Sequence, residues 1–274
     1  MLETELEATA DLRHFLEAIF QRYGYDLRGY ALPSLRRRVA AAVGRAGLSD
    51  IGELERRSVA DPTFFATVLG SLTVRVTEMF RDPCFFQAFR TRVVPILRTY
   101  PTFTIWHGGC ATGEEAYSVA ILLAEEGLFD RCQLYATDVN PHAVEQAKLA
   151  IYPQAAAAAF AANYRAAGGR HDPDRYLTRA YDRISLSAEL RRNVFFFQHD
   201  LVGDHLFGEM EAIFCRNVLI YFGRDLRDRV LKRLGDGLRP RGFLCLGRSE
   251  QLGRAGQARF SDFAPAQRIY RRTS

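Results

Sequence analysis

Residues with the types and spacing of a cofactor site lie between positions 103 and 140. An apolar run at 103–106 leads into a turn at 108–113 that carries three glycines, and a helical pattern begins directly after it. A second apolar run then ends in Asp138. Glycines let a backbone approach a ligand closely, and a carboxylate at the tip of the next strand holds ribose hydroxyls. The layout is typical of a site for a nucleotide-type cofactor.

The two residues directly after the glycine turn are acids, Glu114 and Glu115. They indicate which kind of cofactor the site binds. A helix that seats a pyrophosphate begins at the glycines with bare N–H groups, and two carboxylates there would repel the phosphates. The acids suit a cofactor with a cationic end and no phosphate, such as S-adenosylmethionine with its ammonium and sulfonium. In the alternative interpretation, they are only first-turn acids that the helix macrodipole favours.

The composition is that of an ordinary globular protein. Of 274 residues, 48% are hydrophobic and 25% are charged, and the length favours one large domain with a smaller one. No apolar run reaches the roughly eighteen residues of a membrane span, and the N-terminal segment MLETELEATADL is acidic and unlike a signal peptide. We therefore expect a cytoplasmic protein.

The formal net charge of +5 comes almost entirely from arginine, because Lys148 and Lys232 are the only lysines. The arginines are dispersed apart from Arg36–Arg38, and the sequence has no basic stripe interleaved with aromatic residues, so we expect no nucleic-acid binding. The five cysteines are widely spaced, with no CxxC pair and no cluster with histidine. This pattern predicts buried free thiols and no structural metal.

Residues 11–100 carry helical patterns without convincing strands. Apolar residues at helical spacing predict helices at 12–23, 33–46 and 83–98. Asp61-Pro62 and Asp82-Pro83 each have the form of an N-cap followed by proline at the first helical position. The N-terminal part is therefore expected to be all-helical.

From about residue 101, short apolar runs alternate with helical patterns. The runs predict strands at 103–107, 132–137, 194–198, 211–215 and 243–246. A helix is predicted at 226–238, closed by Pro240 and Gly242, and the final RIYRR is expected to add an edge strand. Strands that alternate with helices indicate a mostly parallel sheet, whose sites lie at the carboxyl ends of the strands.

Residues 153–192 interrupt this alternation. An alanine run at 155–159 precedes Gly168-Gly169, and a polar segment follows. We interpret the region as a helix, a loop and a small insertion of short strands. The predicted fold class is α/β, with a Rossmann-like sheet, an all-helical N-terminal domain and a small β insertion.

Several segments of the sequence together resemble one protein family. They are LTVRVTEMFRDP at 72–83, IWHGGCATGEEAYSVAILLAE at 105–125, YATDVN at 135–140, IFCRNVLIYF at 213–222 and LCLGRSEQL at 244–252. In this order and spacing they are similar to the CheR family, whose members are chemotaxis methyltransferases that use S-adenosylmethionine to esterify glutamates on bacterial chemoreceptors. The resemblance covers roughly residues 12–272, and the RNVLIYF string is specific.

The resemblance implies a role for each matching position. Cofactor contacts are implied for Thr77, Arg81, Glu115, Asp138, Asp200, Leu201, Arg216 and Asn217. Among these, Glu115 takes the methionine ammonium, Asp138 takes the ribose hydroxyls, and Asp200 and Leu201 border the adenine. Arg81 lies near the reacting centre.

Tyr221 is expected to stand near the transferred methyl, so that Arg81 and Tyr221 are the candidate catalytic residues. Simpler explanations remain for some of the matching positions. Tyr221 and Phe222 also suit core packing under the sheet, and Thr77 also suits a helix cap.

The segment at 72–83, which forms the linker between the two expected domains, departs from the family's pattern at two positions. Arg75 stands where asparagine is usual, and Met79 stands where an aromatic residue often precedes FRD. A cation at position 75 adds repulsion to a cationic cofactor unless its side chain turns to solvent or meets the carboxylate end of the methionine. The alanine-rich segment 155–162 also replaces a leucine-bearing segment of the family.

The resemblance also implies domains and partners. A helical N-terminal domain for receptor recognition is expected over 1–85, and a catalytic domain over 86–274 with an insertion subdomain at about 165–197. The expected product is S-adenosylhomocysteine, and the expected partner is the cytoplasmic domain of methyl-accepting chemoreceptors. The protein is expected to be a monomer that meets the membrane only through the receptor. Arg36–Arg38 either dock against an acidic receptor helix or form a solvated helix face.

Two other functions are compatible with the sequence. One is a signalling module that keeps the fold, binds the cofactor poorly because of Arg75 and acts through protein interaction. The other is a carboxyl methyltransferase that acts on small molecules. Transfer of a labelled methyl group to receptor-rich membranes or to free acids distinguishes these functions from receptor methylation.

Overall fold

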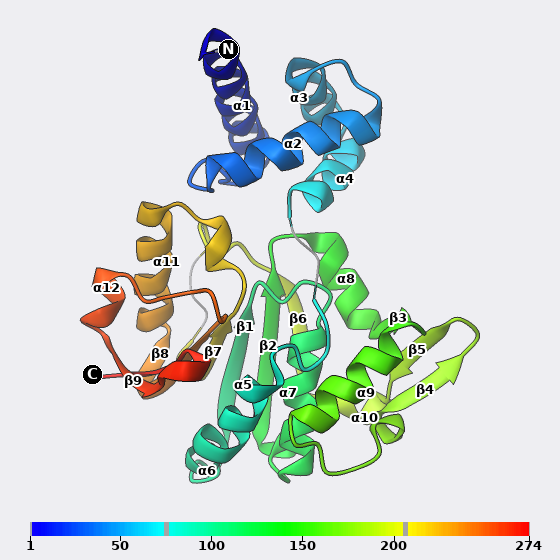
Figure 1. Cartoon of the computed structure of the whole chain (residues 1–274), viewed down its shortest axis with the longest axis vertical. Helices are drawn as coiled ribbons and strands as arrows, with labels where there is room; N and C mark the ends of the chain where they lie inside the picture. The colour runs from blue at the N-terminus through cyan, green and yellow to red at the C-terminus, as the bar shows by residue number, and fades with distance from the viewer. Residues whose placement is uncertain (1, 74–76, 205–207, 274) are drawn as a thin grey trace.

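The computed structural model describes residues 2–73, 77–204 and 208–273. An all-helical unit at the N-terminus is followed by a larger α/β unit, and a small sheet lies at one side of the larger unit (Figure 1). The predicted fold class, a Rossmann-like sheet with an all-helical N-terminal domain and a small β insertion, is confirmed.

The N-terminal unit consists of α1 (Leu2–Tyr23), α2 (Leu32–Ala46), α3 (Ile51–Ala60) and α4 (Pro62–Leu72). Their apolar faces meet in a core of their own, in which Phe15 and Val39 are fully buried. The helices predicted from the apolar spacing of the first two segments are confirmed. Asp61 caps α4 as predicted, because its carboxylate accepts the N–H groups of Thr63 and Phe64.

Asp82 does not cap the next helix, so the second N-cap prediction is wrong. Asp82 has a left-handed φ of 59° and makes no side-chain capping hydrogen bond to α5 (Pro83–Ala88). Its carboxylate instead accepts a hydrogen bond from the guanidinium of Arg216 at 2.8 Å. A long-range ion pair has therefore replaced a local cap.

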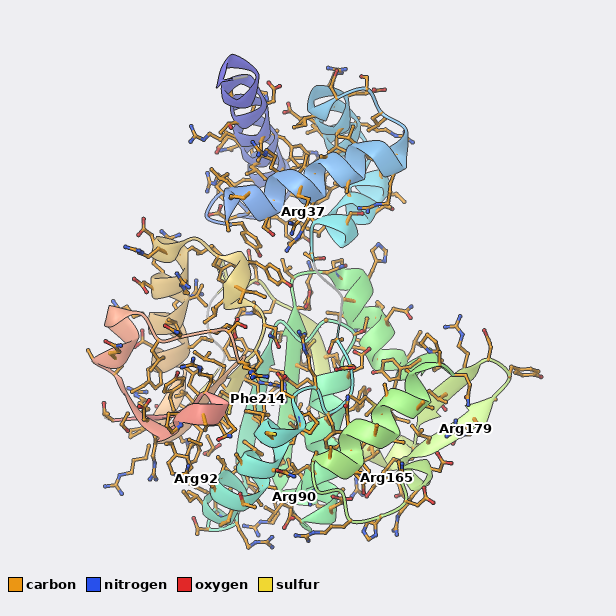
Figure 2. The ribbon with its side chains drawn as sticks, viewed as in Figure 1. Arg37, Arg90, Arg92, Arg165, Arg179 and Phe214 are labelled. Carbon is orange, nitrogen blue, oxygen red and sulfur yellow. The ribbon has the colours of Figure 1, made fainter. Side chains whose placement is uncertain are left out.

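The helical segment predicted at 83–98 is confirmed, and it has three consecutive parts. These are α5, a π-helical turn (Phe89–Val93) and α6 (Val94–Leu97). The segment packs on the sheet through Phe85 and Phe89, whose ring centroids lie 5.6 and 5.1 Å from that of Phe214. Phe214 is labelled in Figure 2. The helix that follows the linker is thus anchored to the middle of the α/β unit.

In the described residues the central sheet has seven strands in the order β6-β2-β1-β7-β8-β10-β9. They are β1 (Phe103–Gly108), β2 (Cys132–Asp138), β6 (Val194–Gln198), β7 (Met210–Cys215), β8 (Leu238–Leu246), β9 (Phe260–Ala264) and β10 (Ile269–Arg272). The pairs β1–β2, β1–β7, β2–β6 and β7–β8 are parallel. The carboxyl ends of these strands therefore meet at one edge of the sheet, on the side of the helical unit (Figure 1).

The two faces of the sheet pack against different helices. Helix α7 (Glu114–Glu125) and the α5–α6 segment share a core with Ile105 and Phe214, whereas α11 (Arg224–Asp236) shares a core with Trp106 and Ile213. Neighbouring residues of one strand thus face opposite cores. A strand buried on both faces needs apolar residues at successive positions, which explains the apolar runs that predicted these strands.

Two predictions about the C-terminal part are wrong. Strand β10 does not form the edge of the sheet, because it lies between β8 and β9 and pairs antiparallel with both. Pro240 and Gly242 do not close the preceding helix, because α11 ends at Asp236 and β8 begins at Leu238. A left-handed φ of 65° at Arg241 and a shift in the pairing register with β7 accommodate the proline within the strand.

The segment that interrupts the alternation folds as a helix and a small antiparallel sheet. Its elements are α9 (Ala156–Ala166), β3 (Ile151–Pro153), β4 (Leu177–Ala180) and β5 (Arg183–Leu186), with the strand order β3-β5-β4. The carboxylate of Glu125, at the end of α7, joins this region to the main unit. It accepts hydrogen bonds from the hydroxyls of Tyr164 and Tyr176 and pairs with Arg90 at 2.5 Å. The remaining helices are α8 (Pro141–Leu149), α10 (Ala188–Arg191) and α12 (Arg254–Gln257).

The five cysteines are all free thiols. Four are buried, as the sequence predicts, but Cys84 is exposed, so the prediction is wrong at this position. Across the described residues, no group of three or more His, Cys, Asp or Glu side chains has the arrangement of a metal site. Nor does any helix in the described ranges have the length and apolar character that crossing a membrane requires.

Candidate functional site

The glycine turn after β1 is fastened to the end of β2 by backbone hydrogen bonds. The N–H groups of Gly109 and Cys110 donate to the carbonyl oxygen of Thr137 at 2.7 and 2.9 Å. The N–H group of Ala111 donates to Oδ2 of Asp138 at 2.8 Å. These bonds give the turn a fixed shape beside the two strand ends.

Gly109 shows why the turn requires glycine. Its φ of +79° lies in the left-handed region, and a Cβ added there would lie 2.4 Å from Cγ2 of Val218. Val218 belongs to the RNVLIYF string that follows β7. The absence of a side chain at Gly109 therefore lets two separate sequence segments come into contact.

Asp138 ends β2 with both carboxylate oxygens bonded to backbone groups. Besides the N–H of Ala111, it accepts the N–H of Asn140 at 2.9 Å through Oδ1. Burial raises the pKa of Asp138, and the two backbone hydrogen bonds oppose that rise. Each oxygen keeps a second lone pair, so the carboxylate is still able to accept hydrogen bonds from a diol.

Glu115 belongs to a chain of three charged side chains centred on the buried Arg216. Its Oε2 accepts a hydrogen bond from Nη1 of Arg216 at 2.5 Å, and Nη2 of Arg216 donates to Oδ2 of Asp82 at 2.8 Å. The Arg216 side chain is 1% exposed, and its guanidinium carbon lies 4.0 Å from the ring centroid of Phe85. Two carboxylates share one cation, so the chain of ionised groups has a net negative charge and favours a further cation.

The structure distinguishes the two adjacent acids at the start of α7. Burial opposes ionisation of Glu115, but the charge of Arg216 and the contact with His107 outweigh it and lower the pKa of Glu115. Glu114 instead accepts hydrogen bonds from the hydroxyl of Thr112, and burial raises the pKa of Glu114 to about 7. Of the two acids, Glu115 is therefore the one whose anion is favoured, and it is also the one that lines a cavity.

Two cavities lie at the carboxyl edge of the sheet. The first, named the Asp138 cavity, is lined by residues that include Asp138, Asp200, Leu201, Tyr30 and Arg38. The second, named the Glu115 cavity, is lined by residues that include Glu115, Thr77, Arg81 and Arg216. Gly109, Asn217 and Tyr221 line both, so the cavities adjoin. Each residue that the sequence suggested for the site lines one cavity or both.

Three lining residues of the Asp138 cavity come from the helical unit and were missed by the sequence reasoning. Tyr30 precedes α2, Arg38 lies within α2, and Thr73 ends α4, all in the part of the chain that the sequence assigned to recognition. The guanidinium carbon of Arg38 lies 4.3 Å from the ring centroid of Tyr221, and Nη1 of Arg38 donates to the carbonyl of Leu72 at 2.7 Å. The arginine run at 36–38 is the sequence feature that could have indicated Arg38. The sequence does not show, however, that one of the three side chains turns toward the cavity.

The other members of the run, Arg36 and Arg37, are exposed on α2. Arg37 is labelled in Figure 2. Arg38 is half-buried. The predicted docking surface therefore has two solvent-facing cations rather than three. Whether they meet a receptor stays a prediction.

The segment that follows β7 is held against the helical unit. The N–H of Ala31 donates to the carbonyl of Tyr221 at 2.8 Å, and the N–H of Gly223 donates to the carbonyl of Gly29 at 2.9 Å. Tyr30 and Phe222 pack edge to face, with ring centroids 5.0 Å apart. Phe222 is buried as the packing interpretation predicts, whereas Tyr221 is only partly buried and faces both cavities.

Thr77 lies between α4 and α5 and caps neither helix, because Thr73 ends α4 and Asp82 precedes α5. The helix-cap interpretation of Thr77 is therefore wrong. Arg75 lies outside the described residues, as do its two neighbours at 74 and 76.

The chemistry of the two cavities fits a cofactor with a cationic end and a diol. The Glu115 cavity supplies a carboxylate within a net negative chain, and the Asp138 cavity supplies a second carboxylate beside the apolar side chain of Leu201. The N–H groups of Gly109, Cys110 and Ala111 in the turn before α7 are given to Thr137 and Asp138, so these three are not available to a phosphate. Fold and site together define the class of S-adenosylmethionine-dependent methyltransferases.

Comparison with known proteins specifies the family. The model of the CheR methyltransferase SAM-binding domain matches residues 75–267, and that of the CheR methyltransferase all-alpha domain matches residues 10–73. The chain is 43% identical to the putative methyltransferase Cher3 of Pseudomonas putida, over 99% of this chain and 100% of that protein. It is 28% identical to the chemotaxis protein methyltransferase of Klebsiella aerogenes, over 89% of this chain and 83% of that one. A relative of the same name from Vibrio parahaemolyticus is 28% identical over 88% of each chain.

The chain therefore belongs to the CheR methyltransferase family, and its cofactor is S-adenosyl-L-methionine. The resemblance drawn from the five sequence segments is confirmed. The two family models meet at residues 73–75, and the division expected at residue 85 stays a prediction.

Proposed function

We propose that this protein transfers a methyl group from S-adenosyl-L-methionine to glutamate side chains in the cytoplasmic domains of chemoreceptors. The products are a glutamate methyl ester and S-adenosyl-L-homocysteine. The observation that carries the proposal is the meeting of Glu115, Asp138, Arg81 and Tyr221 on two cavities that share Gly109. The names of the Klebsiella and Vibrio relatives, chemotaxis protein methyltransferases, support the substrate class.

In this proposal the two cavities bind different parts of the cofactor. Glu115 holds the methionine ammonium, which adds a cation to the net negative chain of Asp82, Arg216 and Glu115. Asp138 accepts the ribose hydroxyls through its remaining lone pairs. Further contacts to the cofactor are assigned to Thr77, Asp200, Leu201, Arg216 and Asn217.

Arg81 and Tyr221 are the proposed catalytic residues of the Glu115 cavity. A glutamate side chain ordinarily has a pKa between about 4 and 5, so the acceptor is already an anion at neutral pH and needs no general base. Arg81 orients this carboxylate by a charge-assisted hydrogen bond. The bond has to be moderate, because the carboxylate loses its charge when the ester forms.

When bound, S-adenosyl-L-methionine supplies a methyl group that its positive sulfonium activates for transfer. The chain's own contribution is alignment and the exclusion of water. The ring of Tyr221 lies under the guanidinium of Arg38, and the backbone carbonyl of Tyr221 accepts the N–H of Ala31. Tyr221 thereby forms one wall shared by both cavities. The helical unit therefore takes part in closing the site and does more than present a recognition surface.

The test is transfer of a labelled methyl group from the cofactor to receptor-containing membranes. We expect label on the receptor that mild base releases, since carboxyl methyl esters are base-labile. Membranes without receptors and receptors whose acceptor glutamates are replaced by alanine serve as controls. Cofactor binding without any transfer would identify a signalling module instead, and label on free acids alone would identify a small-molecule methyltransferase; either result overturns the proposal.

A further inference from the structure

Glu250 places a buried carboxylate beneath the segment that carries Asn217 and Tyr221. It lies in the loop after β8 and is 2% exposed. Its Oε2 accepts the N–H groups of Gly247 and Asn217 at 2.6 and 2.9 Å. Its Oε1 accepts the N–H of Ile220 at 3.3 Å. One side chain thus satisfies backbone groups from two loops that are distant in the sequence.

The backbone at Asn217 depends on this partner. Its φ of +60° lies in the left-handed region, which asparagine tolerates better than most residues, and its N–H lies outside the ladder of β7. A buried N–H without an acceptor is costly, and Glu250 provides the acceptor. The geometry after β7 is therefore tied to the carboxylate of Glu250.

Gly247 permits the close approach that this arrangement needs. A Cβ added at Gly247 would lie 2.7 Å from the backbone nitrogen of Asn217 and 2.8 Å from Oε2 of Glu250. Real side chains do not fit such contacts without displacement of the backbone. Residues 247–250 (GRSE) thus contact the backbone of Asn217 directly and hold it in place.

The segment is held at its other end by the helical unit. The carbonyl of Tyr221 accepts the N–H of Ala31, and the N–H of Gly223 donates to Gly29. Glu250 fixes the start of the segment, where Asn217 and the turn Leu219–Tyr221 begin. Glu250 itself lines neither cavity.

We propose that Glu250 is a positioning residue of the methyltransferase: by holding the N–H groups of Asn217 and Ile220, it sets Asn217 and Tyr221 at the wall shared by both cavities. The inference rests on the proposed cofactor and methyl-transfer roles of those two residues. Its removal is expected to disturb cofactor binding through the backbone, without loss of any direct contact between Glu250 and the cofactor.

Glu211 offers a matched control in the same chain. It is also buried, at 5% exposure, and its Oε2 accepts the backbone N–H of Thr104 at 2.6 Å. It lies in the first part of β7, whereas Arg216 and Asn217 follow the end of that strand. Replacement of either buried glutamate should therefore lower the stability of the protein. Only replacement of Glu250 should also displace Asn217 and Tyr221.

The experiment compares the wild type, E250Q and E211Q by calorimetry with S-adenosylhomocysteine and by amide hydrogen exchange without cofactor. In E250Q an amide nitrogen faces at least one backbone N–H, so we expect affinity to fall about tenfold and exchange of residues 216–222 to accelerate. In E211Q we expect affinity within about twofold of the wild type and unchanged exchange in that segment, even where both variants lose similar thermal stability. E250A should lose more affinity than E250Q. If E250A does not fold, E250Q alone provides the test.

Equal affinity and equal exchange in E250Q and the wild type would overturn the inference. The same result in E250Q and E211Q would also overturn it, because a shared change reports only lost stability. A wild-type protein that fails to bind S-adenosylhomocysteine would instead contradict the proposed function. The wild-type titration therefore separates failure of the inference from failure of the function.

Discussion

Arg216 donates to Glu115 across 2.5 Å, so the carboxylate that we assign to the cofactor's ammonium is already paired with a buried cation. The same guanidinium reaches Asp82, which prevents full neutralisation of Glu115. A ligand ammonium therefore enters a network with one excess negative charge, and it does not need to break the pair. Asp82 lies next to Arg81, so the network also connects the cofactor's methionine end to the linker that carries a proposed catalytic residue.

Replacement of Asp82 by asparagine tests this network. Asparagine tolerates the left-handed backbone of Asp82 but lacks the charge that pairs with Arg216, so more of the Arg216 charge falls on Glu115. We expect S-adenosylhomocysteine to bind about tenfold more weakly to D82N, by calorimetry. D61N is the matched control, because Asp61 also precedes a proline but caps α4, a role that asparagine performs equally well. Equal affinity in D82N and D61N would contradict a role for the network in binding.

Replacement of Asp138 by alanine should weaken cofactor binding by roughly 1.5–3 kcal/mol, because charge-assisted hydrogen bonds to the ribose are lost. The N–H of Ala111 also loses its acceptor, so the turn after β1 should loosen. Titration with S-adenosylhomocysteine measures the first effect. D130A is a suitable control, since Asp130 pairs with Arg192 on the exposed surface. An affinity for D138A within twofold of the wild type would remove Asp138 from the proposed site.

The parts of the fold that the sequence predicted are those with a local signal. The runs that became β1 and β7 are buried at nearly every position, and this burial leaves largely apolar stretches. The place of β10 between β8 and β9 has no local signal, because strand order depends on pairing across the sheet. Pro240 led to the wrong prediction that the preceding helix closes there. The proline lies within β8 instead, where the neighbouring residue Arg241 has a left-handed φ that accommodates it.

The candidate site shows a similar division. Residues such as Glu115 and Asp138 were suggested because they follow glycines or end an apolar run, patterns that lie within one segment. Asp82 and Arg216 form an ion pair although they are 134 residues apart in the sequence. The position of Asp82 directly before a proline suggested a helix cap instead. Glu250 was not singled out within its matching segment, because its partners are backbone N–H groups whose positions only the fold determines.

The stability of the protein should fall with rising pH through Glu114. Burial raises the pKa of its carboxyl to about 7 from an ordinary 4.5. Between these values the unfolded chain has released the proton while the folded protein still holds it, so the free energy of unfolding decreases as pH rises. The effect is absent below about pH 4.5 and complete above about pH 7, with a total on the order of 3 kcal/mol. Denaturant unfolding of the wild type and E114Q from pH 5 to 8 should show the wild type losing stability relative to the variant; parallel curves would contradict the prediction.

The contact between Gly109 and Val218 predicts a partial rescue by a second substitution. In G109A the new Cβ would meet Cγ2 of Val218 at 2.4 Å, and alanine at a φ of +79° also costs about 1–2 kcal/mol. V218A removes the clashing Cγ atoms but leaves the backbone cost. We therefore expect G109A to lose both thermal stability and affinity for S-adenosylhomocysteine, and G109A/V218A to recover part of the affinity. V218A alone should retain most of the binding, and the four proteins form a double-mutant cycle. Additive losses in the double variant would show that the two residues do not limit each other's position at the cofactor turn.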